Sequence, residues 1–130
     1  DSYVEKRKHN LSVWLQNLDS GKYFTEFDVE GNSSFALPLI IRPQYKDRFH
    51  INDDYSSVCD ILDLKDIEYR LGTAGGGNQA IQPYLDNFPF KVIGDLDSVN
   101  YVHNNSLYIG NHIDLTDEQI INLTKVLNDV

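Results

Sequence analysis

Apolar residues recur along the first third of the chain at two spacings. Residues 3–18 carry them on one stripe at helical spacing, which is typical of an amphipathic helix. Residues 34–41 place large apolar side chains at every second position, on one face, which predicts a strand. Pro38 removes a backbone donor from that strand, so we expect either an edge strand or a position of the proline that needs no hydrogen-bond partner. The alternation predicts a buried face made of Phe35, Leu37, Leu39 and Ile41.

Four shorter patterns follow in the middle of the chain. Asp53 and Asp54 offer carboxylates to the start of a helix. Residues 67–70 and 106–109 read as short strands, and residues 97–104 as a short helix that buries Val99 and Val102. The apolar face of the middle helix contains Tyr55, Val58, Cys59 and Leu62.

The last helix has the clearest start. Thr116 followed three residues later by Gln119 forms a capping box, in which each side chain satisfies a backbone donor at the helix start. Leu115 and Ile120 occupy the positions of a hydrophobic staple around it. The predicted buried stripe is Ile120, Leu123 and Leu127, with Ile121 beside it.

The predicted order is helix, strand, helix, strand, short helix, strand, helix. Strands separated by helices of this length favour an α+β fold, a two-layer α/β sandwich with a small mixed or antiparallel sheet covered by helices. At 130 residues the chain has the size of a single domain, residues 1–130.

Composition narrows the function classes. Asp and Glu number 20 against 11 Lys and Arg, a net charge of -9, and an acidic surface repels nucleic acid and anionic membranes. No apolar run approaches the roughly 20 residues of a membrane span. The single Cys59 has no partner for an internal disulfide and lies on an apolar helix face, so we expect core packing, a reducing compartment and a cytoplasmic location.

The chain contains no methionine, even at position 1. This leaves two interpretations open, a processed secreted protein or a piece cut from a longer polypeptide.

The sequence gives little support for a metal site or for a catalytic nucleophile. The four histidines, His9, His50, His103 and His112, are far apart and have no i, i+4 pairing, so we predict no metal site. No serine has the G-x-S-x-G context of a hydrolase, so a serine nucleophile has weak support.

A glycine-rich segment carries the main candidate site. Four of the eight residues from 71 to 78 are glycine, and they lack the Lys-Ser/Thr ending of a P-loop. Asn78 and Gln82 follow, with amides that can donate to and accept from hydroxyl-rich ligands. A mobile surface loop without a ligand is the alternative.

Motifs along the whole chain resemble the C-terminal domain of DegT/DnrJ-type sugar aminotransferases, which are fold type I pyridoxal-phosphate enzymes. Residues 6–10, Lys-Arg-Lys-His-Asn, resemble their KR-x-x-N start, and residues 67–70 resemble their GI-x-x-R. Residues 34–39 are similar to their S-x-x-x-x-P strand, and residues 107–120 are similar to the strand and helix with which they end. The Gly77-Asn78 and Gln82-Pro83 pairs look most like the nucleotide-hexose 3-dehydratase branch. The chain departs from that branch by about two extra loop residues and by Ile81 at an often basic position.

The resemblance implies the C-terminal domain of an enzyme acting on a nucleotide-linked keto sugar, in polysaccharide or deoxysugar biosynthesis. Arg70, Asn78 and Gln82 would bind the substrate, and Asn111 and His112 are weaker candidates. Pyridoxal or pyridoxamine phosphate and its lysine or histidine would belong to a large N-terminal domain. We therefore expect this chain to hold no catalytic residue, to bind no cofactor alone and to be inactive alone. The full-length enzyme would be a homodimer.

Other interpretations stay open. Arg70 could form a salt bridge, Asn78 and Gln82 could cap the loop, and Asn111 and His112 could be turn residues. The chain could also be a stand-alone, non-catalytic binding or regulatory module with the same fold.

Overall fold

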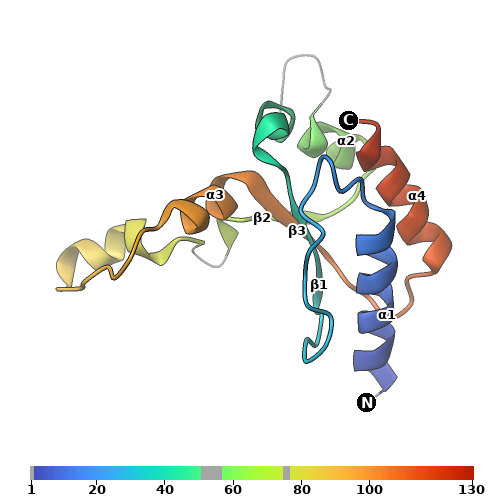
Figure 1. Ribbon diagram of the computed structural model, residues 1–130, viewed down its shortest axis with the longest axis horizontal. Helices are drawn as coiled ribbons and strands as arrows, with labels where there is room; N and C mark the ends of the chain where they lie inside the picture. The colour runs from blue at the N-terminus through green and yellow to red at the C-terminus, as the bar shows by residue number, and fades with distance from the viewer. Residues whose placement is uncertain (1, 51–56, 75–76) are drawn as a thin grey trace.

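Three antiparallel strands form the sheet of this protein, in the order β1-β3-β2 (Figure 1). A computed structural model describes residues 2–50, 57–74 and 77–130. The strands are β1 (Ala36–Ile40), β2 (Tyr69–Leu71) and β3 (Ser106–Gly110). The helices are α1 (Ser2–Asn17), α2 (Val58–Leu64), α3 (Asp97–Asn105) and α4 (Asp117–Asn128), with 3-10 turns η1 (Pro43–Arg48), η3 (Gln79–Ile81) and η4 (Pro83–Asn87). The predicted α+β fold and element order are confirmed, and the sheet is antiparallel.

One face of the sheet is covered by α1 and α4, which pack against each other. The core between these layers includes Trp14 from α1, Leu39 from β1 and Leu127 from α4, all fully buried. Trp14 also donates from Nε1 to the Pro38 carbonyl at 2.7 Å. Since β1 is an edge strand, Pro38 lies where the sequence predicted, and its carbonyl is free to accept this bond.

Local signals predict the start of α4 correctly. The Thr116 hydroxyl accepts from the Gln119 backbone N–H at 3.2 Å, and Gln119 Oε1 accepts from the Thr116 N–H at 2.9 Å. Ile120 and Leu127 are buried, and Leu123 is partly buried against the same core. The capping box and the apolar stripe are therefore confirmed.

The start of α2 differs from the prediction. Ser57 is the N-cap and shares a capping box with Asp60, so the helix begins at Val58. Asp53, Asp54 and Tyr55 lie outside the described residues. Cys59 is buried in the core, as expected.

The prediction for Phe35 is wrong. Phe35 is 70% exposed, whereas the alternation placed it in the core with Leu37. Ser34 has a left-handed φ of 50°, so the chain turns just before β1 begins at Ala36. The turn interrupts the alternation of faces.

An arm formed by residues 79–102 projects from the body of the protein (Figure 1). It contains η3, η4, an irregular connection and most of α3. None of its residues is buried, and Val99 and Val102 are 45% and 40% exposed. The predicted burial of these valines is therefore wrong, because α3 extends beyond the sheet that would have covered them.

No helix in the described parts of the chain combines the length and the apolar character needed to cross a lipid bilayer.

Candidate functional site

The candidate site lies on the sheet face turned away from α1 and α4. Strand alternation places Leu37 and Ile109 on the helix-covered face and their neighbours on the other. On that second face, Arg70 of β2, Tyr108 of β3 and Pro38 of β1 stand in one cross-strand row. We call these three residues the open row.

The adjacent row is covered by α3. Ser106 lies opposite Ile40 and accepts at its carbonyl from the Gly72 N–H at 2.7 Å. The Ser106 hydroxyl donates to the Val102 carbonyl at 2.6 Å, and the Tyr101 hydroxyl donates to the Ile41 carbonyl at 2.7 Å. These bonds hold α3 against the sheet. The open row therefore lies uncovered beside the place where the arm leaves the sheet.

Arg70 supplies the positive charge of the open row. Its Nη2 is 3.1 Å from Glu68 Oε1, and the two side chains are 64% and 82% exposed. An exposed ion pair of this kind contributes little because water screens both charges. The salt bridge anticipated for Arg70 is therefore present, yet a phosphate with two accepting oxygens could replace Glu68 as the partner.

Tyr108 was not among the candidates from the sequence. It is the direct cross-strand neighbour of Arg70 and packs edge-on against Phe35, with ring centroids 5.9 Å apart. A small cavity of about 230 Å³ lies beside this pair, next to Phe27 and Pro38. The alternation in residues 106–109 already places Tyr108 on the face opposite Leu107, but only strand pairing brings it to Arg70.

Asn78 joins the arm to the body. Its side chain is buried, donates from Nδ2 to Asn100 Oδ1 at 2.6 Å and accepts at Oδ1 from the Ala80 N–H at 3.0 Å. Its backbone N–H donates to His103 Nδ1 at 3.0 Å. The capping role anticipated for Asn78 is present, since it caps η3 and ties the loop to α3.

Gln82 lies beside Asn78 and is partly buried. Its Nε2 donates to the Asn78 carbonyl at 3.3 Å. The structure thus brings these two amide residues together at the base of the arm, while Arg70 lies on the strand that leads into the same loop.

Two glycines of the loop allow its backbone to approach α3. A Cβ on Gly77, whose φ is +52°, would lie 2.2 Å from His103 Nδ1. A Cβ on Gly72 would lie 2.5 Å from the Val102 carbonyl. At these positions the glycines make close packing possible.

Asn111 and His112 lie away from the open row. Asn111 is buried on the helix side, where its amide donates to the carbonyls of Arg7 and Ser34 at 2.9 Å and 2.8 Å. His112 is exposed at the surface and pairs with Asp114 at 3.4 Å. The structure therefore does not bring these two residues together with Arg70.

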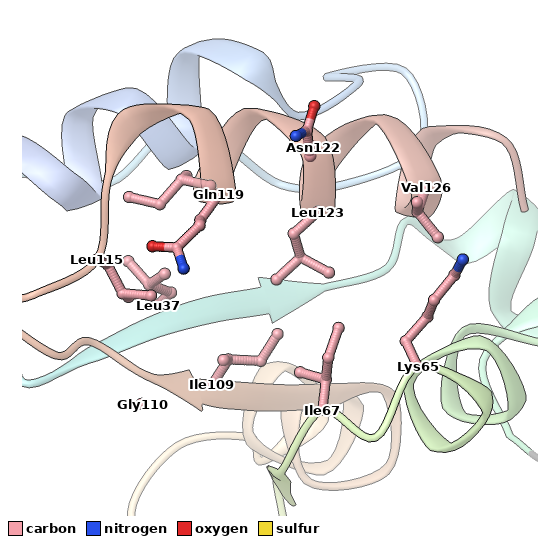
Figure 2. Close-up of a pocket in the computed structure, with 11 residues that line it drawn as sticks. Leu37, Lys65, Ile67, Ile109, Gly110, Leu115, Gln119, Asn122, Leu123 and Val126 are labelled. Carbon is pink, nitrogen blue, oxygen red and sulfur yellow. The ribbon is translucent and has the colours of Figure 1, made fainter.

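A separate groove of about 510 Å³ runs between α4 and the sheet (Figure 2). Figure 2 shows apolar side chains such as Ile109 and Leu123 facing into it, with Lys65 at one end. Such a lining suits apolar contacts and offers few donors for a sugar.

The residues described here do not fit a pyridoxal-phosphate cradle. None of the seven lysines is buried, and Lys22 donates to the Asn128 and Val130 carbonyls. No group of three or more His, Cys, Asp or Glu residues that could hold a metal occurs in the described ranges.

Cys59 is not poised for nucleophilic chemistry either. Burial raises the pKa of its thiol to about 11. At neutral pH the sulfur is therefore protonated, and Cys59 acts as a small core residue.

Comparison with known proteins adds the family context. No protein-family model matches the chain. The lipopolysaccharide biosynthesis protein RfbH of Salmonella typhimurium is 30% identical over 124 residues, covering 92% of this chain and 26% of the relative.

Solved structures share the fold at lower identity. GDP-4-keto-6-deoxymannose-3-dehydratase with a trapped PLP-glutamate geminal diamine has a TM-score of 0.74 and 24% identity, covering 95% of this chain and 31% of its own. The E. coli GDP-4-keto-6-deoxy-D-mannose-3-dehydratase with bound hydrated PLP has a TM-score of 0.75 and 24% identity, covering 96% and 31%.

The chain therefore has the α+β fold of the C-terminal domain of a pyridoxal-phosphate enzyme. More particularly, the resemblance of its motifs to the DegT/DnrJ-type sugar aminotransferases and dehydratases is confirmed, with the dehydratase branch represented among the matches. The chain spans between a quarter and a third of the length of these relatives.

Proposed function

We propose that this chain is the C-terminal domain of a pyridoxal- or pyridoxamine-phosphate-dependent dehydratase or aminotransferase that acts on a nucleotide-linked keto sugar. In this proposal the open row and the base of the arm close one side of the active-site cleft. The complete protein would be a cytoplasmic enzyme of polysaccharide biosynthesis, and its large domain would hold the cofactor.

The observation that carries the proposal is the position of Arg70. An exposed guanidinium stands beside the Tyr108 ring on an uncovered sheet face, in a domain whose fold is shared with the GDP-sugar dehydratase. A nucleotide sugar carries two phosphates and a ring with hydroxyls. It therefore needs both a cation and hydrogen-bonding or stacking groups.

Each residue has a separate part in this proposal. Arg70 binds a phosphate oxygen in place of Glu68. Tyr108, held by Phe35, offers its ring and its hydroxyl to the substrate beside that phosphate. Asn78 positions the loop, because its side chain is bound to Asn100 and Ala80, and Gln82 lies next to it as the amide that contacts the sugar.

The cofactor chemistry would be supplied from outside these residues. Bound pyridoxal or pyridoxamine phosphate provides an electron sink for bond breaking next to the sugar carbonyl. This chain contributes binding and orientation, and exclusion of water from the cleft.

The test is made on the protein encoded by the complete reading frame. We expect roughly 250 further residues before Asp1, stoichiometric absorbance of bound cofactor, and turnover of a nucleotide keto sugar. We expect the 130-residue chain alone to show neither the absorbance nor turnover after incubation with pyridoxal phosphate. A reading frame that starts at Asp1, or a stoichiometric cofactor band with the short chain, would contradict the proposal.

A further inference from the structure

One hydrogen bond between α3 and the base of the arm depends on the protonation state of a histidine. The Asn78 backbone N–H donates to His103 Nδ1 at 3.0 Å. Because a backbone amide can only donate, Nδ1 must be unprotonated, and the neutral ring carries its proton on Nε2. An imidazolium ion has a proton on both nitrogens, so the charged form of His103 cannot accept this bond.

We propose that His103 is a positioning residue whose protonation releases Gly77 and Asn78 from α3. The release itself does not depend on the function proposed above, which gives His103 no role. Its effect on substrate binding rests on that function, because Asn78 and Gln82 lie on the segment assigned to the substrate.

The ring of His103 lies directly against the backbone that it would release. A Cβ on Gly77 would lie 2.2 Å from Nδ1 and 2.9 Å from Cε1, so this edge of the ring faces Gly77 as well as Asn78. A proton added to Nδ1 would therefore face an N–H donor across a packed contact. Neither donor would then have an acceptor, and release of the backbone lets both find one in water.

His103 belongs to the part of α3 that is fixed to the sheet. The Tyr101 hydroxyl donates to the Ile41 carbonyl at 2.7 Å. The Ser106 hydroxyl at the start of β3 donates to the Val102 carbonyl at 2.6 Å. These bonds flank His103 on both sides, so the backbone that donates to the ring is the side of the contact that can move.

A second link between the same elements does not titrate. Asn78 Nδ2 donates to Asn100 Oδ1 at 2.6 Å, and neither amide changes its charge with pH. Within the described ranges, protonation of His103 thus removes one of the two hydrogen bonds from Asn78 to α3. We expect a looser joint at acidic pH and not a detached arm.

The surroundings of the ring are uncharged. A cavity of about 320 Å³ lies beside His103. The other residues that line it are Gly72, Gly77, Asn78, Ser98, Val99 and Val102. No charged side chain from the part of the chain that the structure describes therefore lines this cavity and competes with Asn78 for the ring.

The ionisable groups on the packed elements have other partners or positions. Arg70 on β2 pairs with Glu68, and the Tyr101 hydroxyl is bound to a carbonyl. Asp97 lies at the opposite end of α3. His50 approaches α3 through Nε2, which lies 2.8 Å from the Asn104 carbonyl. A protonated His50 can still donate there, so this contact persists in acid.

The test uses nuclear magnetic resonance on the 130-residue chain between about pH 5 and about pH 8, where histidine ordinarily changes its charge. Hydrogen exchange of the Asn78 amide, corrected for the intrinsic rate at each pH, should show at least about tenfold less protection at the acidic end. Amides of α1 and α4 should keep their protection. The nitrogen chemical shifts of the His103 ring should place its proton on Nε2 at the alkaline end.

Three variants separate this bond from other effects of pH. His103→Asn puts an uncharged amide oxygen close to the position of Nδ1, so protection of the Asn78 amide should persist at every pH. His103→Leu removes the acceptor, so protection should be low at both ends of the range. The matched control is His9→Gln, which removes a titrating histidine from α1, where its Nε2 lies 2.8 Å from Asp117 Oδ1. This control should keep the wild-type pH dependence.

Circular dichroism verifies that each variant keeps its fold, and the wild-type ring shifts decide the matter should His103→Asn not fold. A proton on Nδ1 at the alkaline end would overturn the proposal. Protection of the Asn78 amide that does not change with pH, or an unaltered pH dependence in His103→Asn, would do so too. An equal loss of protection in α1 and α4 would assign the acid effect to the whole fold, and the proposal would fail.

The complete enzyme tests the effect on substrate binding. The KM for the nucleotide sugar in the wild type, divided by that in His103→Asn, should rise by up to about tenfold as the pH falls, because a smaller fraction of the wild type has Asn78 in place. The corresponding kcat ratio should change less. A constant KM ratio would refute this effect. Absence of turnover in both proteins would contradict the proposed function, while the exchange measurements on the chain would still decide the role of His103.

Discussion

Asn10 donates a side-chain hydrogen bond from Nδ2 to Asn111 Oδ1 at 2.9 Å, and both residues are buried. The bond joins the middle of α1 to the residue that follows β3. The Asn111 amide donates in turn to the Arg7 and Ser34 carbonyls. One buried pair therefore connects α1, the end of β3 and the turn before β1. These contacts give a structural reason for asparagine at position 10, the last residue of the segment that resembles KR-x-x-N.

Replacing Asn111 with alanine should destabilise the fold by about 3 kcal/mol, because buried carbonyls lose their donor. Chemical denaturation measures the change, and a double-mutant cycle with Asn10→Ala isolates the coupling between the two side chains. Asn122→Ala on the exposed side of α4 is the control and should change stability by less than about 0.5 kcal/mol. Equal effects of the Asn111 and Asn122 variants would contradict this role.

Asn78→Ala should loosen the arm without unfolding the body. The variant loses the bonds to Asn100 and to the Ala80 N–H, each worth about 1 kcal/mol. Hydrogen exchange should show faster exchange of α3 amides by about tenfold, while α1 and α4 keep their protection. Uniform loss of protection across the chain would mean that Asn78 supports the whole fold instead of this joint.

Gly77 and Gly94 provide a matched comparison, because both have left-handed φ values, +52° and +84°. A Cβ at Gly94 meets nothing within 4 Å, so Gly94→Ala should cost about 1 kcal/mol of backbone strain. A Cβ at Gly77 would collide with His103, so Gly77→Ala should cost more and should displace the loop from α3. Thermal denaturation and hydrogen exchange of the two variants test this order; the reverse order would refute the close packing of the loop.

Cys59 should resist alkylation at neutral pH. Burial raises its thiol pKa from 9.0 to about 11, so about one molecule in a thousand carries a thiolate at pH 8. The iodoacetamide rate should lie more than about 100-fold below that of the urea-unfolded chain and should rise up to about pH 11. Rapid stoichiometric labelling of the folded chain at pH 7 would contradict this.

The same pKa shift gives a direction for stability. The folded state holds the thiol proton more tightly than the unfolded state, so this contribution is fully present below pH 9. It is lost as the pH rises from about 9 to about 11, where unfolding releases the proton. Denaturation of Cys59→Ser at several pH values is the comparison, and its stability should fall less steeply over this range.

Arg70→Ala in the complete enzyme should raise KM for the nucleotide sugar by about tenfold or more and leave cofactor content unchanged. The reason is that the lost guanidinium donates hydrogen bonds to a phosphate of the substrate. Arg70→Lys should recover part of the loss, since it keeps the charge but not the two parallel donors. Lys125→Ala, which removes an exposed cation from α4, should leave KM unchanged. Loss of cofactor with unchanged KM would place Arg70 at the cofactor instead.

Features set by nearby residues could be predicted from the sequence. The start of α4 was predictable because Thr116 and Gln119 are three residues apart and satisfy each other's backbone donors. The edge position of β1 followed from Pro38 in the same way. Predictions that needed the neighbouring element were less successful. Val99 and Val102 have the spacing of buried helix residues, but both are exposed because α3 extends past the sheet.

In the candidate site, too, residue types could be predicted from the sequence but contacts between distant residues could not. The glycine-rich loop, Arg70, Asn78 and Gln82 could be selected from residue type and order. Their environments could not, because a hydrogen bond between Asn78 and Asn100 spans 22 positions. Tyr108 was missed for the same reason, since its relation to Arg70 exists only through strand pairing.

The sequence by itself determined the elements of this protein, their order and the family that they resemble, because periodicity, caps and turns act over a few residues. Tertiary structure alone decided which face of the sheet stays open, which polar residues are buried and where the arm points. These features depend on contacts between distant segments, whose free energies are set by packing and desolvation and not by local propensity.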